Sequence, residues 1–132
     1  MTDDSNLDWI RTFIGKVHIA ATVKHEGEVK DITKIDDPQR ILIHNGISVA
    51  QFLNSYENRH EIEIEDTSET GLTSGLNNII NGINKLNDRK EISGYTKPPT
   101  LNRIEFVPRG EVENTTKCWR KVIEIDVKWE TG

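Results

Sequence analysis

Hydrophobic and polar residues alternate most regularly near the end of the chain, from Trp119 to Glu130. Side chains of a β-strand point to opposite faces in turn, so this pattern predicts a long strand with one buried face. The apolar residues that share this face are Trp119, Ile123, Ile125, Val127 and Trp129. Residues 101–107 predict the preceding strand, with Ile104 and Phe106 inward. We expect the two strands to form a β-hairpin with a long tip.

Three further segments show the alternation of a strand over shorter lengths, namely residues 17–23, 40–44 and 61–66. In the last of them, Ile62 and Ile64 are expected to point inward while the glutamates between them face water. Residues 28–35 fit both a strand and a helix, and both assignments stay open. Together with the C-terminal hairpin, these segments predict a sheet of four to five strands.

Two segments carry apolar residues at helical spacing. Residues 5–14 begin at a candidate N-cap, Ser5, and are followed by Gly15, which predicts a short helix. A longer apolar stripe recurs at intervals of three and four residues, which indicates an amphipathic helix. Its members are Leu72, Leu76, Ile79, Ile80, Ile83 and Leu86.

Residues 47–58 carry conflicting signals. The preceding Asn45-Gly46 is typical of a hairpin turn and favours a strand. A capping box over residues 48–51, a hydrophobic staple and an apolar stripe at helical spacing favour a helix. Because three helix signals outweigh one turn signal, we predict a helix over residues 49–58.

These elements predict an α+β fold: a mostly antiparallel four- to five-stranded sheet with one long amphipathic helix and one or two short helices packed on it. The chain has 132 residues, of which 34% are hydrophobic and 30% are charged, as is typical of a globular protein. A chain of this length is expected to form a single α+β domain over residues 1–132.

Composition indicates which classes of partner and which cellular location to expect. The formal net charge of −5 disfavours a broad phosphate-binding surface, so we expect no nucleic-acid partner. Cys118 is the single cysteine, which excludes an intramolecular disulfide and fits a reducing compartment. The sequence has neither a signal peptide nor an apolar run of about 20 residues. The expected location is cytoplasmic, with no membrane association.

No catalytic, cofactor or metal motif is evident. The four histidines form no metal-binding pair, and residues 67–75 are rich in small residues but lack the Gly-Lys-Ser/Thr of a P-loop. Asp126-Val-Lys128 and Glu28-Val-Lys30 match the acid-x-Lys half of a PD-(D/E)xK nuclease site, which binds Mg²⁺. No convincing upstream aspartate completes that motif. We therefore expect no cofactor, no metal and no small-molecule substrate.

The long helix carries glycines along one flank of its apolar stripe and asparagines on its far side. Each glycine inside a helix costs about 1 kcal/mol relative to alanine, so close packing against a neighbour is the expected reason for the glycines. The neighbour is expected to be either the sheet or another subunit. We take Gly75, Asn78 and Gly82 as a candidate subunit interface.

The order of the predicted elements suggests a family. The chain has an N-terminal helix, an acidic strand that runs into an amphipathic helix over 61–86, and a terminal hairpin that ends in the strand 119–129. This order resembles that of the tail-terminator and tail-completion (neck) proteins of tailed viruses. The resemblance implies a non-enzymatic virion subunit that assembles into a ring, as a homo-oligomer or with other protein subunits. Two alternatives stay open: a small protein-binding or regulatory module, and a Mg²⁺-dependent PD-(D/E)xK-like nuclease.

Overall fold

The computed structural model describes residues 3–18, 22–25, 39–114 and 118–130. Within these ranges it contains two helices and seven strands. The helices are α1 (Asp3–Val17) and α2 (Glu69–Asn87). The strands are β1 (Thr22–His25), β2 (Gln39–Ile43), β3 (Ile47–Gln51), β4 (Ser55–Asp66), β5 (Leu101–Val107), β6 (Glu113–Asn114) and β7 (Trp119–Glu130).

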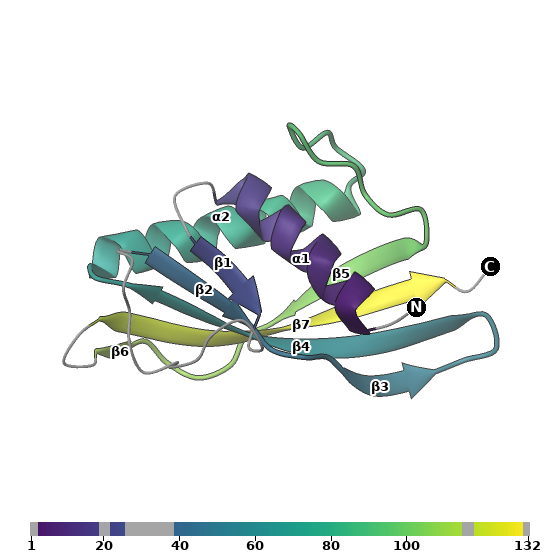
Figure 1. Ribbon diagram of the computed structural model, residues 1–132, viewed down its shortest axis with the longest axis horizontal. Coiled ribbons are helices and arrows are strands. Elements are labelled where there is room, and N and C mark those ends of the chain that lie inside the picture. The colour runs from purple at the N-terminus through teal and green to yellow at the C-terminus, as the bar shows by residue number, and fades with distance from the viewer. Residues whose placement is uncertain (1–2, 19–21, 26–38, 115–117, 131–132) are drawn as a thin grey trace.

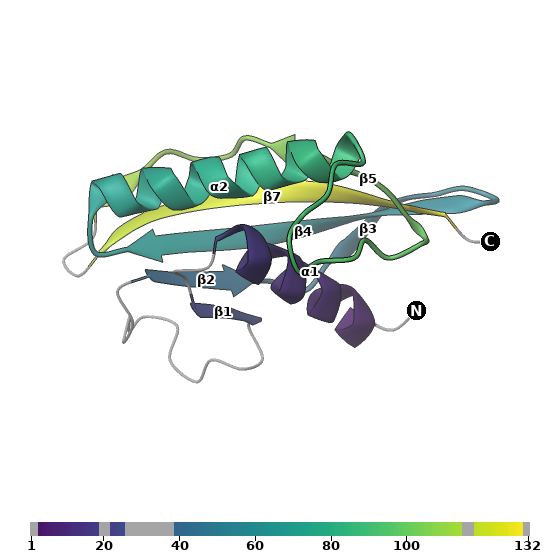
Figure 2. The same cartoon turned by 90° about the horizontal axis from the view of Figure 1, so that it is seen from above.

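All seven strands belong to one sheet, whose main order is β1-β2-β4-β7-β5. Off this path, β3 pairs with β4 and β6 pairs with β7. Paired strands are antiparallel except β1 and β2, which run parallel with Thr22 opposite Arg40. Both helices cover one face of the sheet, which we name the core face (Figure 1; Figure 2 shows the same arrangement from above). The opposite face is the polar face.

The two longest strands, β4 and β7, form the centre of the sheet. They pair over their full length, from Ser55 opposite Glu130 to Asp66 opposite Trp119. Residues that lie opposite each other in a ladder share a face, so the apolar residues of both strands collect on the core face. The fully buried members are Ile62, Ile64, Ile123, Ile125, Val127 and Trp129.

The two helices complete the hydrophobic core. Their buried apolar residues are Trp9, Ile10, Phe13 and Ile14 of α1, and Leu72, Ile79, Ile83 and Leu86 of α2. The ring of Trp9 packs edge-on against Trp129, with the ring centroids 5.4 Å apart. Trp119 is partly buried and packs against the same core, so both tryptophans of β7 face the helices as predicted. Neither described helix has the length and apolar composition that a membrane span requires.

The α+β class, the mostly antiparallel sheet and the long helix are confirmed, while the details differ. The sheet has seven strands rather than four or five, and one of its pairs is parallel. The strand predicted over 17–23 is wrong at its start, because Val17 is the last residue of α1. Packing of Val17 against α2 continues the helix past Gly15. Residues 28–35, whose assignment was open, lie outside the described residues.

The predicted helix over residues 49–58 is wrong. Residues 47–51 form β3, a turn follows, and β4 begins at Ser55. The capping box and the staple are local signals, and a cap contributes only about 1 kcal/mol. Strand pairing instead gives residues 56–59 partners on both sides, in β3 and in β7. Pairing with distant segments therefore overrides the local helix signals.

Asn45-Gly46 is not the hairpin turn that its sequence suggests. β2 and β3 pair one after the other with the same edge of β4, so residues 44–46 connect them without reversing the chain. A Cβ on Gly46 would lie 2.6 Å from the ring of the buried His60. Glycine is required here because the backbone approaches that ring so closely.

We expect Trp129→Ala to lower the free energy of unfolding by about 3–5 kcal/mol, because it leaves a large cavity in the core. Trp129 is 1% exposed, whereas Val112 is 45% exposed and serves as the control. Val112→Ala should change the same free energy by less than about 0.5 kcal/mol. Urea denaturation followed by circular dichroism measures both, and similar values for the two variants would contradict the assigned core.

Candidate protein interface

The polar face of the sheet is a ladder of ion pairs between neighbouring strands. Arg40 of β2 donates a hydrogen bond of 2.8 Å to Glu65 of β4, and both side chains are less than a tenth exposed. Arg59 of β4 donates two hydrogen bonds to Asp126 of β7, at 2.6 and 2.9 Å. Further ion pairs on this face are Arg59–Glu124, Arg109–Glu124, Arg120–Glu63 and Lys128–Glu105. The ring of His44 also lies within hydrogen-bond distance of Glu63, at 2.7 Å.

Both charged residues of the acid-x-Lys triplet of β7 take part in these ion pairs. Asp126 and Lys128 both project from the polar face, but Asp126 pairs with Arg59 and Lys128 pairs with Glu105 at 2.9 Å. The hydrogen bond to Asp126 raises the pKa of Arg59, and the one to Glu105 raises the pKa of Lys128. Among the described residues, no group of three or more His, Cys, Asp or Glu side chains suits a metal ion. The second triplet, residues 28–30, lies outside the described residues.

Residues 67–75, which are rich in small side chains, form a capped start of α2. Ser68 is the N-cap, and its hydroxyl accepts a hydrogen bond of 3.0 Å from the backbone N–H of Gly71. The carboxylate of Asp66 accepts one of 2.8 Å from the backbone N–H of Ser68. The side chains of Asp66 and Ser68 thus accept hydrogen bonds from two backbone N–H groups that a phosphate bound at this helix end would need.

The glycine flank of α2 packs against the end of α1. A Cβ on Gly82 would lie 2.5 Å from a methyl carbon of Val17, and one on Gly75 would lie 3.0 Å from Nε2 of His18. The side-chain nitrogen of Asn78 lies 3.0 Å from Nδ1 of His18. The close neighbours of Gly75 and Gly82 are therefore His18 and Val17, at the end of α1, rather than the sheet or a second subunit. The subunit interface at Gly75, Asn78 and Gly82 stays a prediction. The glycines no longer support it, because residues of the same chain account for the close packing at Gly75 and Gly82.

His18 is buried in this contact between the two helices, with 5% of its surface exposed. Burial lowers its pKa below the ordinary value of 6.5, and the carboxylate of Asp66 opposes this shift in part. The imidazole is therefore neutral at neutral pH. It contributes a hydrogen-bonding polar group to an otherwise apolar packing contact.

Exposed apolar side chains gather on the hairpin that β3 and β4 form. Ile47 is 63% exposed, Val49 39%, Phe52 60% and Leu53 94%, and we name these four residues the apolar hairpin. Within residues 8–18, 22–23, 40–114 and 118–130, Val112 is the one other large apolar side chain that is exposed. Figure 1 shows the hairpin projecting beyond the helices at one end of the sheet. Large exposed apolar patches are typical of interaction sites, so the apolar hairpin is the candidate for one.

The sequence pattern assigned most of these residues to a predicted helix, whereas the structure places them on a hairpin. Val49, Phe52, Leu53 and Tyr56 form the apolar stripe of the predicted helix. In the structure Tyr56 does reach the core, where its ring stacks on Trp129 with centroids 6.3 Å apart. The other three are exposed, Val49 least, because the hairpin of β3 and β4 extends beyond the area that the helices cover.

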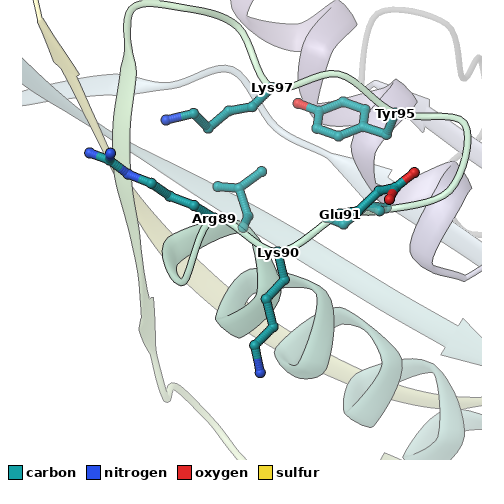
Figure 3. A pocket seen from close by; sticks show the side chains of 7 residues that line it. Arg89, Lys90, Glu91, Tyr95 and Lys97 are labelled. Carbon is teal, nitrogen blue, oxygen red and sulfur yellow. The ribbon is translucent and has the colours of Figure 1, made fainter.

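A pocket of about 470 Å³ lies where α2 ends, and we name it the basic pocket. It is lined by Leu86, Arg89, Lys90, Glu91, Ile92, Tyr95 and Lys97. In Figure 3 the side chains of Arg89 and Lys97 extend to the same side, whereas that of Lys90 points away from Tyr95. The hydroxyl of Tyr95 is buried and has no hydrogen-bond partner among the described residues. Burial raises the pKa of Tyr95 to about 12, so the hydroxyl stays protonated.

Sequence reasoning missed the basic pocket. Spacing in the sequence gives no reason to bring the cations of residues 89–97 near Tyr95. The loop turns back on itself at Gly94, whose φ of 73° favours glycine, and Ile92 pairs there with Tyr95. Tyr95 then packs on Phe13 of α1, with the ring centroids 5.5 Å apart.

Comparison with known proteins assigns the chain to no family. No protein-family model matches it. A search of curated proteins also finds no significant match. Its function is therefore inferred from the residues and the geometry described above.

A methyl group is expected to have opposite effects at two helical glycines. Gly82→Ala should lower the free energy of unfolding by about 1–3 kcal/mol, because its Cβ would overlap Val17. Gly15→Ala should raise that free energy by up to about 1 kcal/mol, because a Cβ at Gly15 has no neighbour within 4 Å. Urea denaturation measures both, and a more stable Gly82→Ala variant would show that α1 does not pack as closely as described.

Acid should weaken the protein through His18. Its pKa is lower in the folded than in the unfolded chain, so the unfolded chain binds more protons and stability falls as the pH drops below about 6.5. His18→Gln keeps a polar partner for Asn78 without this titration. Between about pH 7.5 and pH 5, the wild type should lose more unfolding free energy than His18→Gln. Parallel curves for the two proteins would contradict the burial of a neutral His18.

Proposed function

We propose that this protein is a non-enzymatic assembly subunit that binds copies of itself or other protein subunits through the apolar hairpin. Its place would be in a ring of the tail-terminator or neck type, as the order of its elements suggests. The observation that carries the proposal is the concentration of exposed apolar side chains on this single hairpin.

Exposure of these side chains is costly to an isolated subunit. Burying a Val, Leu, Ile or Phe side chain contributes about 1.5–3 kcal/mol. The apolar hairpin forgoes most of this for Ile47, Phe52 and Leu53 and a smaller part for Val49. A partner surface that covers Ile47, Val49, Phe52 and Leu53 would recover it. A surface of this composition is typical of the core of a protein interface.

The position of the hairpin also favours a protein partner. β4 is held along its full length by β7, so the projecting end is an extension of the central sheet. Among the described residues, β3 pairs with β4 alone, which leaves its outer edge without a strand partner. An open edge offers backbone N–H and C=O groups to another chain. A preorganised strand also loses little conformational entropy when it binds.

The double variant Phe52→Ser/Leu53→Ser tests this proposal. The wild type should form a species larger than one chain in light scattering coupled to size-exclusion chromatography, and the double variant should elute as a monomer. Its melting temperature as a monomer should be nearly unchanged, because both side chains are at least 60% exposed.

Val112→Ser is the matched control, since Val112 is exposed but lies outside the hairpin. It should assemble as the wild type does. A wild type that remains monomeric over a wide range of concentrations would reject the assembly function and favour a binding module for another partner.

A further inference from the structure

We propose that Asn87 closes the outer edge of β5, so that no strand of another chain can add to the sheet there. Asn87 is the last residue of α2. Its side-chain nitrogen donates a hydrogen bond of 2.7 Å to the carbonyl of Ile104, and its side-chain oxygen accepts one of 3.0 Å from the N–H of Ile104. The proposal is independent of the assembly function, because β3 and β5 flank the β4–β7 pair on opposite sides.

The contact of Asn87 reproduces the pairing of two antiparallel strands. In an antiparallel ladder, every second residue exchanges both an N–H and a C=O hydrogen bond with one residue of its neighbour. The amide of Asn87 supplies an acceptor oxygen and a donor nitrogen on one planar group, as that neighbour would. Because both backbone groups of Ile104 bind Asn87, they point away from β7 and are the groups that an added strand would need.

Other features of the same edge also oppose strand addition. In the part of the chain that the structure describes, β5 pairs with β7 alone. The charged residues Arg103 and Glu105 are exposed on β5, and the pairing is irregular between Leu101 and Arg103. Pro108, which has no backbone N–H, follows the end of the strand. Charged residues, bulges and prolines are the usual means by which edge strands avoid pairing with other chains.

The edge of β3 lacks most of these features. Its residues, Ile47–Gln51, include no charged side chain and no proline, although a bulge lies between Ser48 and Ala50. The two outer strands therefore differ, since β3 can accept another chain whereas β5 is closed. A contact in which β3 of one copy pairs with β5 of the next is thereby excluded, and with it an open fibre built by repeated addition of strands.

Asn87→Ala removes the amide and tests the proposal in the Phe52→Ser/Leu53→Ser background, which lacks the apolar side chains of the hairpin turn. At low protein concentration, the amide hydrogen of Ile104 should exchange about 5- to 10-fold faster than with Asn87, as expected for the loss of one hydrogen bond. The exchange of the Glu105 amide should be unchanged, because this group points toward β7. Hydrogen exchange followed by NMR measures both amides.

Higher protein concentration provides a second measurement. The Asn87→Ala chains should form dimers and larger species in sedimentation velocity, and in these species the Ile104 amide should be protected again by the added strand. Asn87→Asp keeps the acceptor for the N–H of Ile104 and should remain monomeric with a protected amide. Asn87→Ser, whose side chain is too short to bind both groups, replaces Asn87→Ala if that variant loses its fold.

Two controls separate an open edge from a general loss of stability. Asn81→Ala makes the same change at an exposed position of α2, and Gly82→Ala lowers stability through its overlap with Val17. Both should remain monomeric in the same background. None of these results depends on whether the wild type assembles through the hairpin.

Several results would overturn the closure of β5 by Asn87. They are association of Gly82→Ala to the same degree, association of Asn87→Ala without renewed protection of Ile104, and association of Asn87→Asp. An Asn87→Ala variant that stays monomeric at every concentration, or whose Ile104 amide exchanges as it does with Asn87, would overturn it equally.

Discussion

The full-length pairing of β4 with β7 is the constraint on which the rest of the structure depends. Its register is specified from both faces at once: Ile62 lies opposite Ile123 on the core face, and Arg59 lies opposite Asp126 on the polar face. A shift by one residue would turn the apolar side chains of one strand toward water and its charged ones toward the helices. The helices and the outer strands pack on the β4–β7 pair, which can bury its apolar side chains in only one register.

Charged residues on the polar face reinforce this alignment. A buried carboxylate is costly unless a cation and hydrogen bonds satisfy it, so Glu65 is tolerable only where Arg40 reaches it. Asp126 depends in the same way on Arg59. The acid-x-Lys triplet of β7 thus serves the pairing of strands, and its charges are engaged by neighbours in the same sheet. Both charged residues of this triplet, which resembles half of a nuclease motif, form ion pairs within the sheet.

The unequal lengths of the strands produce the feature most relevant to function. β4 extends beyond β2, and its first residues pair with β3 instead, outside the area that the helices cover. The hairpin is therefore paired by backbone hydrogen bonds, but its exposed apolar side chains lie outside the hydrophobic core. By contrast, the glycine flank of α2, which looked like a subunit contact, is filled by Val17 and His18 of the same chain. The interface proposed for assembly accordingly lies on the hairpin, while the one predicted at Gly75, Asn78 and Gly82 stays a prediction.

The sequence by itself determined α2, β5 and β7, because their periods of 3.6 and 2.0 arise from local backbone geometry and persist over many residues. It did not determine residues 47–58, where a capping box competed with pairing to a strand far along the chain. The glycines of α2 required a close neighbour, but only the packing of α1 decided which one. The basic pocket likewise exists because Tyr95 returns to α1. The periodicity of a helix or strand depends on residues that are neighbours in the sequence. Which segments contact one another depends on the tertiary structure, because those segments are far apart in the sequence.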